Sequence, residues 1–138
     1  MHLALLSILV PDYDAGIDFF VRQLGFDLLE DTDLGSGKRW VRVAPTGAQT
    51  AFLLARAVGD RQIAAIGEQG GGRVWLFLQT DDFDATHHRF VANGVRFDEA
   101  PRDEEYGRVA VFADPFGNRW DLIQFHAIHD AKTKTGHT

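Results

Sequence analysis

The sequence predicts an α+β protein made of two tandem copies of one unit, in which a strand and a helix precede three further strands. Two observations support this. The chain repeats itself at a spacing of 70 residues, and both halves show the same order of apolar, helical and alternating segments. Two such copies imply a pseudo-twofold axis and a crevice between them, where we expect a ligand. The matching positions are Asp12, Asp14 and Ala15 with Asp82, Asp84 and Ala85; Phe20 and Val21 with Phe90 and Val91; Val41 with Val111; and Pro45 and Gly47 with Pro115 and Gly117.

The first half opens with a predicted strand and helix. Residues 3–10 form an apolar run interrupted only by Ser7, which is typical of a buried strand. Asp12 or Asp14 can cap the helix that follows. That helix has one apolar face and a glycine at its C-terminal end, supplied by Ile17, Phe20, Val21, Leu24 and Gly25.

Three strands are predicted to complete the first half. In the second of them polar and apolar residues alternate, so that Val41 and Val43 face one way while Trp40 and Arg42 face the other. The strands are expected at residues 26–29, 38–44 and 50–55, with a turn at 45–47.

The second half repeats this order. Asp82 or Asp84 caps its helix, and Asn93-Gly94 ends it. The hairpin near its end turns at residues 114–117, where Asp, Pro and Gly occupy the first, second and fourth positions that a type I turn prefers. Its strands are expected at residues 74–79, 95–97, 108–113 and 119–125.

The domain organisation follows from these elements. We expect a single domain with a first module at about residues 1–55 and a second at about 73–126. A glycine-rich linker at about 56–72 joins them, and residues 127–138 form a polar, flexible tail.

Composition excludes several classes of function. The chain has no cysteine, so it has no disulfide, no thiolate nucleophile and no sulfur-ligated zinc. A net charge of −6 opposes nucleic-acid binding, which needs clustered Lys and Arg. No apolar run approaches the ~20 residues of a membrane span, and no signal peptide is evident. We expect a cytoplasmic protein without a membrane or nucleic-acid partner.

Two segments resemble the vicinal oxygen chelate superfamily, which includes glyoxalase I, extradiol dioxygenases and bleomycin-resistance proteins. They are Val10-Pro11-Asp12 to Leu24-Gly25-Phe26, and Tyr106-Gly107-Arg108 to Trp120-Asp121-Leu122 with Phe112 to Asn118 inside it. The resemblance covers about residues 3–126. It implies two βαβββ modules that form a curved eight-stranded mixed sheet around a ligand cavity, usually within a homodimer.

In the metal-dependent members of that superfamily, four inward side chains from the first and fourth strands of each module hold a divalent ion. The matching positions here are Leu5, Ala51 or Phe52, Trp75 and Asp121. Only Asp121 can bind a cation, and a catalytic metal normally needs three protein ligands. We therefore expect no metal and no cofactor at this site.

Aromatic and charged residues remain as candidates to line the cavity: Trp40, Arg42, Trp75, Arg108 and Asp121. Trp75 and Trp40 offer flat surfaces for stacking on a planar or cationic ligand, or they simply fill the cavity as core. Asp121, if buried, needs a partner. An ion pair with Arg42 or Arg108 would supply one; a ligand amine, or a role as general base, is the alternative.

Two functions of different classes follow. The first is a metal-free protein that binds and sequesters a small molecule as a homodimer, similar to the bleomycin-resistance proteins. The alternative is an enzyme of the glyoxalase or dioxygenase type (a lyase, isomerase or oxygenase) with a non-standard site, for which only the fold and Asp121 argue.

Overall fold

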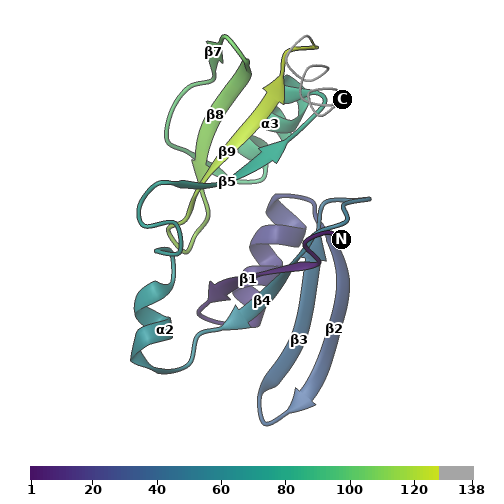
Figure 1. Ribbon diagram of the computed structural model, residues 1–138, viewed down its shortest axis with the longest axis vertical. Helices are drawn as coiled ribbons and strands as arrows, with labels where there is room; N and C mark the ends of the chain where they lie inside the picture. Colours follow the sequence, from purple (N-terminus) through teal and green to yellow (C-terminus); the bar gives the residue numbers. More distant parts are fainter. Residues whose placement is uncertain (128–138) are drawn as a thin grey trace.

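The computed structural model describes residues 1–127, so nearly all of the expected tail lies outside the described residues (Figure 1). The elements in chain order are β1 (Leu5–Val10), α1 (Tyr13–Ile17), the π-helix η1 (Asp18–Gln23), β2 (Asp27–Gly35), β3 (Lys38–Ala44), β4 (Ala51–Arg56), α2 (Gly59–Ala65), β5 (Val74–Gln79), α3 (Phe83–Ala92), β6 (Arg96–Phe97), β7 (Arg102–Glu104), β8 (Gly107–Ala113) and β9 (Arg119–Phe125). Among these helices none is both long and apolar enough to cross a membrane.

The strands of the described residues form two sheets, one from each half of the chain. The first has the order β1-β4-β3-β2, and the second has the order β5-β9-β8-β6 with β7 paired to β8. In each sheet the first strand of the half runs parallel to the last. The α+β class is confirmed. Within one chain, however, the strands do not join into the continuous eight-stranded sheet that the resemblance implies.

A side chain from the linker binds the edge of β1. The amide of Gln69 accepts from the backbone N–H of Leu9 at 2.9 Å and donates to the carbonyl of Ser7 at 3.1 Å. These are the two groups that a neighbouring strand would engage. The edge of β1 is therefore occupied by Gln69 instead of by β5.

The repeat in the sequence recurs in the local geometry of the two helices. Asp12 accepts from the Ala15 N–H at 2.8 Å, and Asp82 accepts from the Ala85 N–H at 3.1 Å, which decides between the two candidate caps in each half. Gly25 and Gly94 both follow the helix ends with positive φ, as expected for glycines that stop a helix. The first helix differs only in continuing as the π-turn η1.

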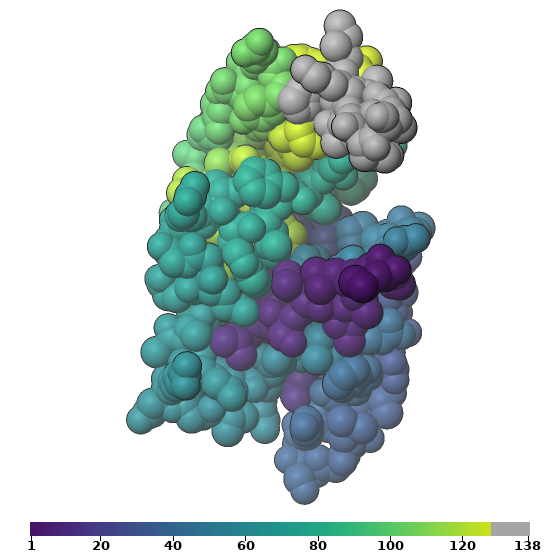
Figure 2. Space-filling model, viewed as in Figure 1, coloured from purple at the N-terminus to yellow at the C-terminus, as the bar shows by residue number. Residues whose placement is uncertain are grey.

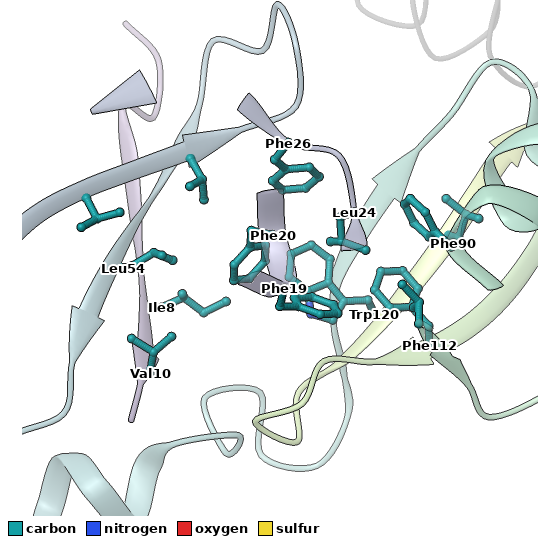
Figure 3. Packing of buried hydrophobic residues seen from close by; sticks show 14 of the residues in the cluster. Ile8, Val10, Phe19, Phe20, Leu24, Phe26, Leu54, Phe90, Phe112 and Trp120 are labelled. Carbon is teal, nitrogen blue, oxygen red and sulfur yellow. The ribbon is translucent and has the colours of Figure 1, made fainter. Parts of the chain in front are cut away.

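The two modules share one apolar core. Trp120 of the second module lies 5.9 Å from Phe20 and 5.6 Å from Phe52 of the first, measured between ring centroids. The helix of the first module lies between the two sheets (Figure 3). The core therefore occupies the helix-covered face of each sheet, and the opposite faces, here called the open faces, point away from it.

A reciprocal pair of hydrogen bonds marks the pseudo-twofold axis. Gln23 Nε2 donates to the Asn93 carbonyl at 3.2 Å, and Asn93 Nδ2 donates to the Gln23 carbonyl at 3.1 Å. The two residues are 70 positions apart and so occupy equivalent places in the repeat. The helix ends of the two modules thus meet directly at the axis.

The predicted turn after β8 is organised by one buried carboxylate. Asp114 accepts hydrogen bonds from the backbone N–H groups of Phe116 and Asn118, from the Asn118 side chain and from the Trp120 indole, at 2.9–3.1 Å. Besides shaping the turn, Asp114 therefore fixes the tryptophan that joins the two modules.

Candidate functional site

Two of the five candidate residues share a cavity on the open face of the first sheet. This cavity has a volume of about 460 Å³, and its lining includes Leu5, Glu30, Trp40, Arg42 and Ala51. The alternation in β3 places Trp40 and Arg42 there, because Val41 and Val43 turn into the core. The cavity lining belongs entirely to the first half of the chain.

Arg42 is held in place on this face by Glu30 of the neighbouring strand. Its Nε donates to Glu30 Oε1 at 3.0 Å, and Thr32 donates to the other carboxylate oxygen at 3.0 Å. The hydrogen bond from Arg42, followed by that from Thr32, lowers the pKa of Glu30. Within residues 1–127 only the Nε of Arg42 is hydrogen-bonded, so its terminal nitrogens can donate to a ligand beside the indole of Trp40.

Asp121 lies on the open face of the second sheet, next to Phe77 and opposite Val111. Only 6% of the residue is exposed, and its Oδ1 has no hydrogen-bond partner in the described part of the chain. Desolvation raises the pKa of this carboxyl, and the charge of Arg102 opposes that rise. A buried carboxyl with an unused acceptor is suited to receive a donor from a ligand.

Neither arginine expected to pair with Asp121 does so. Arg42 is engaged by Glu30, and Arg108 pairs with Asp84 at 3.3 Å and with Asp103 at 3.0 Å. Arg108 lies three positions before the β8 residue that faces Asp121, so its side chain projects to the opposite, helix-covered face. There its guanidinium stacks over Phe83 at 5.4 Å.

The cation that sequence reasoning missed is Arg102. It lies on β7, where it pairs with Glu99 and Glu104, and Glu99 also accepts from the Val111 N–H. The strands expected from the sequence do not include this segment, whose residues are all polar and show no apolar alternation. Pairing of β7 with β8 brings this arginine toward the open face of the second sheet.

Trp75 neither stacks in the cavity beside Trp40 nor fills it as core, the two alternatives that the sequence left open. It is half-buried and packs against the shared core, and a Cβ atom at Gly70 of the linker would lie only 2.7 Å from the Trp75 Cβ. The residue therefore fills space between β5 and the linker. It does not line the cavity that contains Trp40.

Metal-binding groups are sparse around these residues. In the described part of the chain, no three His, Cys, Asp or Glu side chains lie close enough together to hold a metal ion. The open face of the first sheet carries the indole of Trp40 and the guanidinium of Arg42, and the open face of the second sheet carries the desolvated carboxyl of Asp121. Within one chain these two sets of groups lie on different sheets.

Comparison with known proteins places this geometry in a family. Residues 2–122 match the model of the Glyoxalase/Bleomycin resistance protein/Dioxygenase superfamily. An uncharacterized protein of Shewanella frigidimarina is 48% identical over 128 residues, which cover 91% of this chain and 93% of that protein.

Solved structures of similar fold are consistent with this family match. The structure of UcmS2 superposes with a TM-score of 0.77 at 26% identity, covering 89% of this chain and 97% of that one. TnmS3, an antibiotic binding protein from Streptomyces sp. CB03234, gives a TM-score of 0.73 at 37% identity, covering 91% and 97%. The chain therefore belongs to the glyoxalase/bleomycin resistance protein/dioxygenase superfamily.

Proposed function

We propose that this protein binds a planar small molecule on the open face of its first sheet, without a metal. The observation that carries the proposal is the cavity in which Trp40 lies beside the anchored Arg42. Its volume of about 460 Å³ falls within the range of small-molecule sites. TnmS3, an antibiotic binding protein that is 37% identical to this chain, supports the same class of function.

The site is completed by a second copy of the chain. Because the modules share a core through their helix-covered faces, a ligand stacked on Trp40 meets only the first module of its own protomer. The open face of the second module, with Asp121 and the 65% exposed Phe77, is available to cover it from the partner. An exposed aromatic residue in the middle of a strand favours such a contact.

The chemistry of these groups defines the ligand. Trp40 stacks on an aromatic plane, which contributes about 0.5–1.5 kcal/mol beyond simple burial. The terminal nitrogens of Arg42 donate to a carbonyl or hydroxyl of the ligand, and Asp121 accepts from an amine or hydroxyl. We expect a planar cation to bind more tightly than a planar anion.

Isothermal titration calorimetry with proflavine, a planar cation, and anthraquinone-2-sulfonate, a planar anion, tests the proposal. We expect proflavine to bind more tightly, and Trp40→Ala to weaken it about tenfold. Leu34→Ala removes another exposed apolar side chain of the first sheet, outside this cavity, and should leave the affinity unchanged. Equal affinities of wild type and Trp40→Ala, or no binding of either probe, would contradict it.

An acid–base enzyme is the second candidate, and Asp121 is the observation that favours it. Its pKa is raised by desolvation, a property of carboxyl groups that transfer protons near neutral pH. Binding and catalysis are separated by mass spectrometry of the ligand after prolonged incubation. An unchanged ligand supports sequestration, and a converted one supports the enzyme.

A further inference from the structure

We propose that the cleft between the two modules beside α3 is a second ligand site, and that it takes a small amphipathic anion. It has a volume of about 490 Å³ and lies between the end of β5 and the turn that joins β3 to β4. The space-filling view is indented between the two modules on the side where β5 ends (Figure 2). Both modules line it, with Gly25, Pro45 and Thr46 from the first and Leu78, Thr86 and Arg89 from the second.

Charge determines which ligand this cleft accepts. Among the described residues, Arg89 is the only charged one in the lining, although the whole chain carries a net charge of −6. Within residues 1–127 its guanidinium forms no ion pair; it lies over the Phe90 ring at 5.5 Å. Its Nε lies 4.0 Å from the place that a Cβ atom would take at Gly25, so the side chain reaches from α3 to the first module. An anion entering the cleft therefore meets a cation that no carboxylate of the described residues neutralises.

The rest of the lining suits an apolar body. Leu78 and Pro45 line the cleft and are half-buried. The other apolar lining residues are buried: Leu24, Phe26, Phe90 and Leu122. The hydroxyls of Thr80 and Thr86 hydrogen-bond to each other at 2.7 Å and add a polar edge. A carboxylate attached to a short hydrocarbon or a single ring matches one cation beside an apolar surface.

The pseudo-symmetry supplies an internal comparison. A cavity of about 580 Å³ lies on the other side of the helix pair, against the turn after β8. There Phe19 stands at the position equivalent to Arg89, 70 residues earlier. The cations of that cavity, Arg96 and Arg119, share Asp98 at 3.8 and 3.6 Å. Anion selectivity is therefore expected only in the cleft beside α3.

Backbone amide NMR spectra of the full chain, titrated with octanoate, octanol and octylammonium, test this site. We expect octanoate to shift the amides of Gly25, Thr46 and Thr86 saturably, octanol to bind at least about fivefold more weakly, and octylammonium to leave these amides unshifted. Arg89→Gln should weaken octanoate about tenfold, and Arg89→Lys should restore part of the loss. Arg96→Gln, in the pseudo-symmetric cavity, is the matched control and should change nothing.

Three outcomes would overturn the proposal: no saturable shift at millimolar octanoate, shifts confined to the open faces around Trp40 or Asp121, or an Arg89→Gln affinity equal to wild type. Arg89 is exposed, so the variant should keep a wild-type spectrum in the absence of ligand. Trp40→Ala must leave octanoate binding unchanged, which separates the failure of this site from the failure of the open-face site.

Discussion

At the scale of single residues, two buried aspartates of one hairpin have opposite surroundings. The carboxylate of Asp114 accepts four hydrogen bonds, whereas Asp121 Oδ1 accepts none within the described residues. The first side chain stabilises the fold. The second reduces stability while it is ionised, unless a ligand donates a hydrogen bond to it.

Replacement of Asp114 by alanine should be severely destabilising. It leaves the Trp120 indole and the Asn118 amide buried without an acceptor, and each such group costs about 1–3 kcal/mol. We expect the free energy of unfolding in urea to fall by at least about 3 kcal/mol. Asp103→Ala, which removes an exposed partner of Arg108, should cost under about 1 kcal/mol. Similar losses for the two variants would show that Asp114 does not anchor the turn.

Asp121→Asn should stabilise the protein at neutral pH. Because burial raises the folded-state pKa of Asp121, the folded protein binds the proton more tightly than the unfolded chain, and stability falls as pH rises through the folded pKa. Asparagine does not ionise, so the variant does not lose this stability as pH rises. Its advantage in urea unfolding should therefore be present at pH 7.5 and vanish near pH 4, at about the unfolded pKa. A variant less stable than wild type at pH 7.5 would mean that the carboxylate is well satisfied.

Sequence reasoning located these residues but could not assign all of their partners. Asp114 was recognisable from its turn, and Asp121 from its match to a metal-ligand position of the superfamily that the sequence resembles. The approach of Arg102 depends on the pairing of β7 with β8, for which three polar residues give no periodic signal. The exclusion of Arg108 follows only once the register of β8 against β9 is known.

At the scale of elements, the edge of β1 is the feature least evident from the sequence. The linker was expected to be a flexible connection, yet Gln69 within it forms two hydrogen bonds to the β1 backbone. A glutamine in a glycine-rich segment carries no pattern that indicates such a contact. The repeat predicted the position of every strand except β7, but β2 extends to Gly35 because its hydrogen bonds to β3 continue through polar residues.

Truncation of Gln69 should loosen this edge. Gln69→Ala removes two hydrogen bonds, each with a net contribution of about 0.5–1.5 kcal/mol, and leaves the Leu9 N–H without a partner. We expect the Leu9 amide to exchange with deuterium at least about fivefold faster. The adjacent Glu68→Ala, at an exposed side chain, should leave that rate unchanged. Equal exchange in the two variants would show that Gln69 does not protect the strand.

At the scale of the whole molecule, the repeat predicted two modules but not the way in which they pack. A pseudo-twofold axis is compatible with contact through sheet edges or through helices, because both surfaces are partly apolar in sequence. In the structure the modules pack through their helix-covered faces, where Trp120 of the second module contacts Phe20 and Phe52 of the first. With the helix-covered faces joined, the open faces turn outward, and a ligand between Trp40 and Asp121 requires two protomers.

This two-protomer site is tested most directly by binding to mixed dimers of two weakened variants. Trp40→Ala and Asp121→Asn protomers each lack one half of the proposed site. If Trp40 of one protomer meets Asp121 of the partner, a mixed dimer contains one intact site and one doubly defective site. After equal mixing and exchange, proflavine calorimetry should recover wild-type affinity in about a quarter of all sites. If the mixture binds no better than the separate variants, the ligand site does not span two protomers.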